Sequence, residues 1–335
     1  MIKFGNITEE EYKNGLRSLN VNNSLGFEQT VTTLTHILAK VQEQKYYTLL
    51  GQSLTDFVPV EIGTGSYSGQ IFQYRIGKIG DPFESGVVSP GNGVNKDAAV
   101  DIEIDGANIK NNFWRFDYTV TKELIEMAKV NAQNFSIIEQ KEAARLKTYQ
   151  LGIQRVAFLG LENDTAVKGL LNQSDVTVNT DLLGAKLKDM TLAQMQAFVK
   201  GIIDKFCKNN NYTVYPNRLL ISSEDYNILG TQWSAEFPSM TVRQVLLEAF
   251  KGITGNDFKI VHATYCDNAG TAGARYVLYN CDPDTLTMYL PRPYTPHPLF
   301  PQGSLDLVSQ AEAQFTGVWV KRPKELLYLD VTSST

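Results

Sequence analysis

The amino-acid sequence predicts an α+β fold organised around one long helix, and three observations carry this prediction. Residues 134–160 show an uninterrupted helical pattern, much longer than the three or four turns that are usual in a globular domain. Two strand patterns, near residues 70–79 and 99–106, flank a long segment rich in Gly, Pro, Asn and Ser. Helices and strands then follow one another from about residue 191 to 290, where we expect an α/β insertion.

The composition is typical of a soluble protein and speaks against several classes. The 335 residues suffice for about two domains with real cores. The net charge of -5 argues against a nucleic-acid-coating protein, because phosphate binding needs concentrated Lys and Arg. No apolar run approaches the roughly 18 residues of a membrane span, and the N-terminus lacks the apolar core of a signal peptide. Cys207, Cys266 and Cys281 lack CxxC spacing, which predicts free thiols in a reducing compartment.

The first residues are predicted to form an arm. Thr8 and Glu11 have the spacing of a capping box for a short helix, and a turn-rich stretch follows it. Large apolar residues are sparse between residues 1 and 27, so this segment could hardly fold alone. A second helix is predicted over residues 28–47, where Val31, Leu34 and Leu38 share one stripe.

A long hairpin is predicted next, with different side chains on its two faces. The apolar residues that alternate with polar ones are Phe72, Tyr74 and Ile76 in the first limb and Val100, Ile102 and Ile104 in the second. The opposite face of the second limb carries Asp101, Glu103 and Asp105, which we call the acidic ladder. A two-stranded hairpin with a long loop is poorly stable alone, so we expect it to rest on another structure.

The long helix follows a short aromatic strand at residues 113–118 and a short helix at 121–131. Ser136 and Glu139 have capping-box spacing at its start. One face is predicted to hold Ala143, Leu146, Tyr149, Ile153, Val156 and Gly160. Away from that face we expect Lys141, Glu142, Arg145, Lys147 and Arg155.

The rest of the chain alternates between helices and strands. A connection with buried Leu170 and Leu171 leads to a helix capped by Thr191 and Gln194, and a further helix starts at Thr241. Strands are predicted near residues 218–222, 258–264, 275–280 and 286–290. The proline-rich segment 291–301 must be extended, and its PxxP pattern is interpreted as a stiff connector rather than a docking ligand. Strands over residues 305–315 and 325–331 close the chain.

The sequence shows no motif with the spacing of an active site. The stretches GTGSYSG and GNGVNK lack the pattern of a phosphate loop and are interpreted as ordinary loops. His36, His262 and His297 stand far apart, without HExxH or GxSxG, and no Cys/His cluster has zinc spacing. We therefore predict no catalytic residue, no cofactor and no metal, and a protein that is not an enzyme.

The acidic ladder has two interpretations. Its three carboxylates could bind a cation, because they line one face of a strand. Alternatively it is a solvated strand edge paired with Arg75 and Lys78 across the hairpin, and we favour this second interpretation because a half-exposed strand requires such alternation.

The order of several stretches resembles a known family. KYYTLL and FVPV precede the polar hairpin, ELIEMA and the AAR-containing helix ending in FLG follow it, and VKGLLN, PNRLLISSEDYNIL and AQFTGVWVKRPKELLYLD come in turn. In this order the chain resembles a major capsid protein of a tailed bacteriophage with the Hong Kong 97-like capsid fold. It is similar in particular to the branch with a GV.V.RP strand near the C-terminus. The resemblance covers nearly the whole chain, and order and spacing carry it.

The resemblance implies a division of the chain. Residues 1–54 would be the N-terminal arm, 55–113 the E-loop, 114–190 the peripheral domain with the spine helix, 191–300 the axial domain, and 301–335 the return strands of the peripheral domain. The arm is too short for a long fused scaffolding domain, so a separate scaffolding protein, or none, is expected. Candidate assembly residues are Phe4, Tyr12, Asp81, Pro82, Phe83, Glu84, Asp101, Glu103, Asp105, Glu142 and Arg145.

The implied function is structural. Copies of the chain would assemble into hexamers and pentamers of an icosahedral phage head that encloses double-stranded DNA without sequence-specific binding. The virion would form in the cytoplasm of a bacterial host, with scaffolding, portal and decoration proteins as possible partners and no membrane. Two alternatives stay open: the shell of an encapsulin-like bacterial nanocompartment, and a non-capsid α/β enzyme or ligand-binding protein.

Overall fold

The computed structural model describes residues 53–80, 100–130, 137–184, 186–234, 237–255, 257–271, 273–303 and 305–331. The predicted arm, the helix over residues 28–47, the hairpin loop and the Ser136 cap lie outside these residues. The chain divides into two compact units. One comprises Met1–Tyr47, Tyr118–Ala144 and Leu299–Ser309, and the other comprises Thr48–Asp117, Arg145–Pro298 and Gln310–Thr335.

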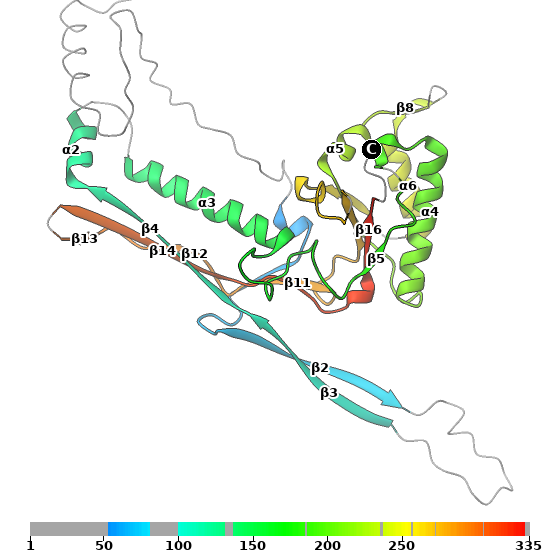
Figure 1. Cartoon of the computed structure of the whole chain (residues 1–335), viewed down its shortest axis with the longest axis horizontal. Helices are drawn as coiled ribbons and strands as arrows, with labels where there is room; N and C mark the ends of the chain where they lie inside the picture. Colours follow the sequence, from blue (N-terminus) through cyan, green and yellow to red (C-terminus); the bar gives the residue numbers. More distant parts are fainter. Residues whose placement is uncertain are drawn as a thin grey trace, which may run out of the picture. The chain divides into compact units, whose positions relative to one another are not determined.

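Most of the predicted elements are confirmed (Figure 1). The α-helices are α2 (Lys122–Val130), α3 (Ile137–Leu159), α4 (Leu192–Asn209), α5 (Ser223–Ile228) and α6 (Val242–Thr254). The first strands are β1 (Val60–Ile62), β2 (Gln70–Gly80), β3 (Val100–Lys110), β4 (Asn112–Thr121), β5 (Thr177–Asn179), β6 (Arg218–Ile221), β7 (Gln232–Ser234) and β8 (Phe237–Thr241). The later strands are β9 (Lys259–His262), β10 (Arg275–Tyr279), β11 (Leu286–Leu290), β12 (Arg292–Pro296), β13 (Phe300–Gln302), β14 (Asp306–Phe315), β15 (Val318–Val320) and β16 (Leu326–Asp330).

A five-stranded mixed sheet forms the centre of the larger unit. Its strand order is β5-β16-β10-β6-β9, with β10 antiparallel to both of its neighbours. Side chains alternate along β10, so Tyr276 and Leu278 join one buried cluster while Val277 and Tyr279 join another. Because both faces are covered, the sheet separates two cores.

Helices cover one face of this sheet. Phe206 of α4 and Phe250 of α6 are fully buried in the cluster that contains Leu278. Figure 1 shows α4 and α6 next to each other beside the sheet. Both helices begin with the predicted capping boxes, Thr191 with Gln194 and Thr241 with Gln244, which satisfy free amides of the first turn.

The other face of the sheet packs on the C-terminal half of α3. Ile153, Val156, Ala157 and Phe158 share a buried cluster with Tyr328 and its neighbours. The three-stranded sheet β1-β11-β15 contributes to the same cluster through Met288 and Val318. The C-terminal half of α3 therefore packs directly on the sheet at the centre of the larger unit.

The predicted buried face of α3 is correct in its second half and wrong in its first half. Ile153 and Val156 are buried as expected, whereas Ala143 and Leu146 are exposed. Arg145 was expected away from the buried face, but only 1% of its surface is exposed. Arg145 can be buried because its guanidinium has polar partners inside the unit. Helical periodicity alone places this charged residue on the polar face of the helix.

The remaining strands form smaller sheets. β14 lies between β12 and β13 and also pairs with β4, while β2 and β3 form a two-stranded sheet and β7 and β8 another. The proline-rich segment predicted as a connector contributes β12 and β13, and β12 departs from regular register between Arg292 and Thr295. Proline removes a donor from the ladder, which explains its place in edge strands. The last strand, β16, pairs with β10 and β5, and its Tyr328 lies in the same buried cluster as the C-terminal half of α3.

Candidate functional site

The described residues offer no arrangement for metal or nucleophilic chemistry. Among them, no group of three His, Cys, Asp or Glu side chains could hold a metal ion. His262 is buried and stacked on Tyr226, and its Nδ1 lies 3.1 Å from the Ser223 hydroxyl oxygen. Burial lowers the pKa of His262, which keeps the ring neutral. These contacts are those of a structural histidine.

The three cysteines are equally unsuited to reaction. Cys207 and Cys266 are buried and Cys281 is half-buried, and all three are free thiols. Burial raises the pKa of each thiol, most strongly that of Cys266. The thiolate is the reactive form of cysteine, and a raised pKa leaves little thiolate near neutral pH.

Among the helices described, none is long and apolar enough to cross a membrane.

The β2–β3 hairpin is the feature best suited to contact another molecule. Its strands pair in register over eleven residues a side, from Gln70 opposite Lys110 to Gly80 opposite Val100. Phe72 and Tyr74 stack edge to face on one side of it, and they remain 50% and 72% exposed. Phe72 covers Gly106, where any Cβ would overlap its ring. An exposed aromatic pair on a thin hairpin is an apolar surface available for docking.

The strand register corrects one interpretation of the acidic ladder. Asp105 lies opposite Arg75, whereas Glu103 and Asp101 lie opposite Gly77 and Ile79. Lys78 lies opposite Ile102 and therefore belongs to the other face of the hairpin. Only one of the two proposed basic partners can thus pair with the ladder inside the hairpin.

A second feature is the junction that links α3 to the strands. We define the junction as residues 167–173. Backbone amides of Leu170 and Leu171 donate to the last turns of α3, to Ala157 and Phe158, at 2.8 and 2.9 Å. Lys168 accepts from the Val318 amide at 2.8 Å, which connects the junction to β15.

Buried side chains complete the junction. The Tyr328 hydroxyl on β16 donates to the Leu170 carbonyl at 2.6 Å, and Arg275 on β10 donates to the Leu171 carbonyl at 2.7 Å. The Arg275 guanidinium also forms two bonds with Asp330, at 2.6 and 2.7 Å, and lies 4.6 Å from the Tyr328 ring centre. Two parallel bonds of this kind hold a guanidinium rigidly. Burial alone would raise the pKa of Asp330, but Arg275 and Thr271 hold it below its usual range.

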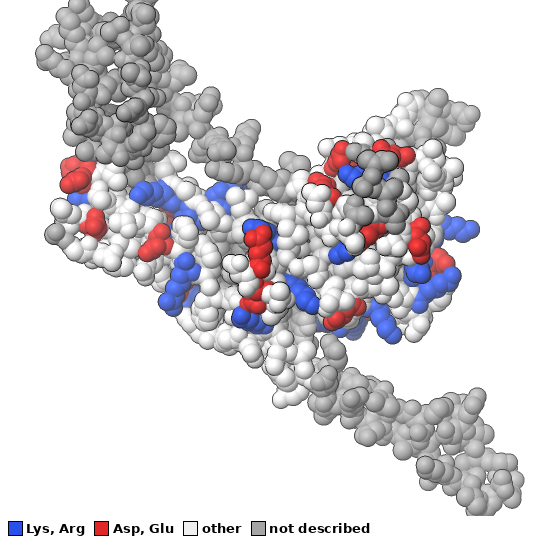
Figure 2. Space-filling model, viewed as in Figure 1, with Lys and Arg blue, Asp and Glu red and all other residues white. Residues whose placement is uncertain are grey.

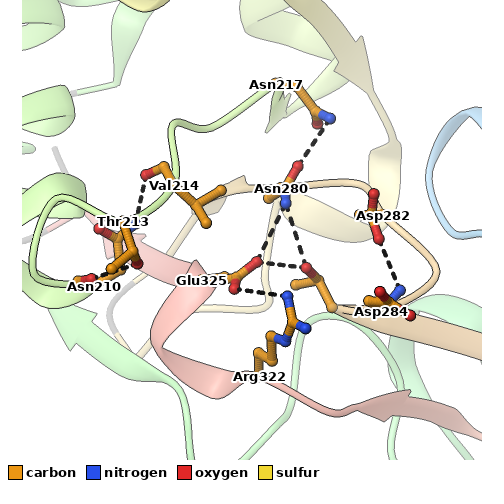
Figure 3. Close-up of polar contacts among 10 residues, drawn as sticks. Asn210, Thr213, Val214, Asn217, Asn280, Asp282, Asp284, Arg322 and Glu325 are labelled. Carbon is orange, nitrogen blue, oxygen red and sulfur yellow. Dashed lines mark hydrogen bonds and ion pairs between the residues drawn. The ribbon is translucent and has the colours of Figure 1, made fainter.

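A polar network lies at one end of the central strands β6, β10 and β16 of the five-stranded sheet (Figure 3). Glu325 is buried and accepts from the Thr285 hydroxyl at 2.5 Å and from Asn280 at 3.2 Å. Arg322 reaches its other carboxylate oxygen at 3.4 Å, and Asn217 donates to Asn280 at 3.0 Å. A buried carboxylate with several donors is satisfied and structural.

Arg145 joins α3 to an aromatic cluster. Its Nε donates to the Tyr294 hydroxyl at 3.0 Å and a terminal nitrogen donates to the Phe116 carbonyl at 3.3 Å. Trp114 and Tyr149 pack around Tyr294, with ring centres 6.2 and 5.3 Å from it. Burial raises the pKa of Tyr149 to about 12, so its phenol stays neutral. Trp114 and Tyr149, with Ile153, Val156 and Phe315, also line a pocket of about 360 Å³.

The candidate assembly residues from the sequence have different outcomes. Phe4, Tyr12, Asp81, Pro82, Phe83 and Glu84 lie outside the described residues. The acidic ladder is described by its backbone only. Glu142 is half-buried on α3, and Arg145 is buried within its own unit. No assembly role is tested for any of them, and all stay predictions.

The sequence analysis predicted buried Leu170 and Leu171, which is confirmed, but it missed the partners of the junction and the Arg275–Asp330 ion pair. Arg275 and Asp330 lie 55 residues apart, and no local pattern indicates that they meet. A signal did exist for β16, because Leu326 to Leu329 are apolar without interruption and all are buried. Such a run is typical of a central strand covered on both faces.

Charged side chains form no broad field of one sign on the face drawn in Figure 2, where Lys and Arg are interspersed with Asp and Glu over the described residues. A mixed surface of this kind offers no basic footprint for nucleic acid. The exposed β2–β3 hairpin and the buried junction are therefore the two candidate functional features of the described residues.

Solved capsids have the same fold. The capsid protein of Myoviridae phage XM1 is similar at a TM-score of 0.74 with 17% identity, covering 89% of this chain and 97% of that one. A protein of Microbacterium phage Oxtober96 is similar at 0.57 with 8% identity, covering 89% and 95%. One of Mycobacterium phage Che8 is similar at 0.54 with 16% identity, covering 90% and 98%. The predicted α+β, Hong Kong 97-like capsid fold is thereby confirmed.

Sequence comparison identifies the family. No curated protein sequence matches this chain. A family model described as major capsid protein matches residues 92–331, which is well over half of the chain. Together with the fold, this match shows that the chain belongs to the major capsid protein family and is a structural capsid subunit.

Proposed function

We propose that this chain assembles with copies of itself into hexamers and pentamers, and that these form the icosahedral head of a tailed bacteriophage around double-stranded DNA. The observation that carries the proposal is the β2–β3 hairpin. It shares no sheet with another strand of the described residues and exposes Phe72 and Tyr74. Because a two-stranded hairpin is marginal alone, a neighbouring subunit is its natural support.

The division of the chain follows from this function. Residues 1–54 act as the arm, 55–113 as the E-loop, 114–190 with 301–335 as the peripheral domain, and 191–300 as the axial domain. The five-stranded sheet supports the last assignment in part, since β6, β9 and β10 come from that range. β5 and β16 join the same sheet from outside the range, which ties the axial and peripheral parts together through two strands.

Further partners belong to the same proposal. Assembly takes place in the cytoplasm of a bacterial host, with a separate scaffolding protein, a portal and decoration proteins as candidate partners. The mixed surface charge supports DNA enclosure without sequence-specific binding, since Lys and Arg are interspersed with Asp and Glu on the face drawn in Figure 2.

Electron microscopy of the purified full chain tests the proposal. Negative staining and sedimentation should show closed shells or ring-shaped capsomers. A species that stays monomeric at every concentration and salt would contradict the proposal and favour an α/β protein of another class.

The contents of native particles separate the two kinds of shell. Particles isolated from producing cells should contain DNA that resists added nuclease. A folded enzyme in place of DNA would identify an encapsulin-like nanocompartment instead.

A further inference from the structure

The loop before β2 has an unusual backbone. We call residues 63–69 the base loop, because they lead directly into the hairpin. Gly63, Gly65 and Tyr67 have φ values of +90°, +76° and +62°. Glycine adopts this left-handed region readily, but a tyrosine does not. Such a conformation persists only where surrounding contacts impose it.

Three strands of the larger unit, β11, β12 and β14, contact the base loop. The Gly63 amide donates to the Leu290 carbonyl of β11 at 3.0 Å. The Tyr67 amide donates to Oε1 of Gln314 on β14 at 2.8 Å, and Gln314 is itself buried. The Arg292 guanidinium of β12 lies 4.9 Å from the centre of the Tyr67 ring. The left-handed tyrosine is therefore fixed at both its backbone and its side chain.

Asn111 also holds the base loop. It is the single residue between β3 and β4, and only 5% of its surface is exposed. Its Nδ2 donates to the Ser68 carbonyl at 2.7 Å and approaches the Gly65 carbonyl at 3.4 Å. Its backbone amide donates to the Gly69 carbonyl at 3.0 Å. Asn111 follows β3 and bonds to residues that precede β2, so it connects the two strands of the hairpin at their base.

The base loop is the place where the hairpin is attached to its unit. In the described residues β2 and β3 pair only with each other. Near the base, Lys110 forms an ion pair with Asp164, which adds one exposed contact to the body. Exposed pairs contribute little, so the buried amides are the stronger attachment.

We infer that the base loop is a clamp that sets the direction in which hairpin β2–β3 leaves the subunit, with Asn111 and Gln314 as its positioning residues. This inference deepens the proposed function, because a hairpin that must dock on a neighbour gains from being held in one direction before docking. Preorganisation of this kind lowers the entropic cost of association.

Two substitutions release the clamp, and the chain offers a matched control for each. Asn111→Ala removes the Nδ2 donor. Its control is Asn210→Ala, because Asn210 is equally buried at 5% and donates from Nδ2 to the Val214 carbonyl at 2.7 Å, in a turn that contacts no part of the hairpin. Asn111 and Asn210 thus make the same kind of hydrogen bond at the same burial, and they differ only in their place in the fold.

Tyr67→Pro excludes the left-handed backbone and removes the amide donor to Gln314. Its control is Tyr212→Pro, because Tyr212 has φ +58° and its amide donates to the Cys207 carbonyl at 2.7 Å. The two tyrosines are also 65% and 63% exposed. A surface position lets the variant fold even where Asn111→Ala does not.

Hydrogen exchange on the unassembled full chain is the first measurement. The amides of Ser68 and Asn111 should exchange about tenfold faster in both clamp variants than in the wild type, the factor that one lost hydrogen bond represents. The Tyr67 amide should do the same in Asn111→Ala, while proline leaves no amide to measure at position 67 of the other variant. All three amides should be unchanged in the two controls. Unchanged exchange in the clamp variants would overturn the inference, whether or not shells form.

Shell formation is the second measurement. If wild-type shells form, the clamp variants should assemble with a yield about tenfold lower than their matched controls at equal melting temperature. Equal yields would show that the loop is held but does not position the hairpin. If the wild type forms no shell at all, the proposed function fails, and hydrogen exchange alone decides whether the clamp exists.

Discussion

Single residues explain why the junction is so tightly built. Gly160, Gly169 and Gly317 come from three separate sequence stretches and meet here. A Cβ on Gly169 would overlap the Phe158 carbonyl, and one on Gly317 would overlap the Lys168 carbonyl. Because the obstacles are backbone atoms, no side-chain rotation can relieve them. Glycine is required for close approach of chain segments at these positions.

Substitution of Gly169 should therefore destabilise the subunit. We expect Gly169→Ala to lower the free energy of unfolding by about 1–3 kcal/mol, the usual cost of overpacking. The control is Gly152→Ala in α3, where a Cβ meets nothing within 4 Å. That change should raise the free energy of unfolding by about 0.5–1 kcal/mol, because alanine is the better helix former. Urea unfolding of the unassembled chain measures both, and equal effects would contradict the packing argument.

The Arg275–Asp330 pair should make stability depend on acid. The folded-state pKa of Asp330 lies below its ordinary value, so its contribution is complete above the unfolded pKa of about 3.9 and is lost as the pH falls through the folded value. The difference in unfolding free energy between the wild type and Asp330→Asn should thus be constant near neutral pH and shrink below about pH 4.

An exposed pair provides the control for this pH effect. Asp204 contacts Lys208 at 2.7 Å in solvent. Asp204→Asn should change stability little at any pH, because exposed pairs contribute about 0–1 kcal/mol. Urea unfolding between pH 3 and 7 makes the comparison. A difference for Asp330→Asn that does not vary with pH would show that its charge is not responsible.

At the scale of elements, local sequence patterns predicted helices and strands better than they predicted which elements pair with one another. The capping boxes at Thr191 and Thr241 and the limbs of the hairpin follow from spacing of a few residues, and the structure confirms them. Burial of Arg145 and the pairing of β16 depend on residues far away in sequence, Tyr294 and Arg275 among them. The base loop was interpreted as an ordinary loop because Gln314, which fixes it, lies 247 residues from Tyr67.

The two halves of α3 should respond differently to truncation. Ile153 is buried against the sheet, so Ile153→Ala should cost about 2–5 kcal/mol through lost burial and a cavity. Leu146, predicted on the same face, is exposed, and Leu146→Ala should cost less than about 0.5 kcal/mol. Urea midpoints of the two variants measure this contrast. Equal losses would mean that the whole predicted face is buried.

The acidic ladder should act between subunits. Two of its three residues lack a basic residue opposite them in the hairpin, so we expect Lys or Arg of a neighbour to face them. Changing Asp101, Glu103 and Asp105 to Asn, Gln and Asn should weaken assembly without unfolding the subunit. High salt should weaken wild-type assembly too, because exposed charges are screened over about 8–10 Å at physiological ionic strength.

Neutralising Asp181, Asp189 and Asp257 instead is a control that removes the same charge from exposed positions elsewhere. Light scattering at increasing salt compares the two triple variants. Loss of wild-type shells with a chelator, reversed by calcium, would support the cation site instead. If the ladder variant assembles and resists salt and chelator like the wild type, the remaining interpretation is that the acidic ladder is only a solvated strand edge.

At the scale of the whole molecule, we expect stability and assembly to depend on different parts of the chain. The five-stranded sheet is buried on both faces and supplies a core of its own. The hairpin has no such core, and the sequence of residues 1–27 is equally poor in large apolar residues. Segments that bury little apolar surface alone become ordered when a partner supplies the missing surface. The subunit should accordingly fold without them and assemble with them.

Deleting residues 1–27 tests this division. The truncated chain should keep the melting temperature of the unassembled subunit, because the sequence of the deleted segment is poor in large apolar residues. It should form shells poorly, or shells that dissociate at lower denaturant, because each subunit loses its contact with a neighbour. Circular dichroism of the subunit and sedimentation of the shells separate the two effects. Replacing residues 1–27 by a Gly/Ser segment of equal length controls for chain length, since such a segment stays flexible. Normal shells of unchanged stability from the truncated chain would show that residues 1–27 make no contact that holds subunits together.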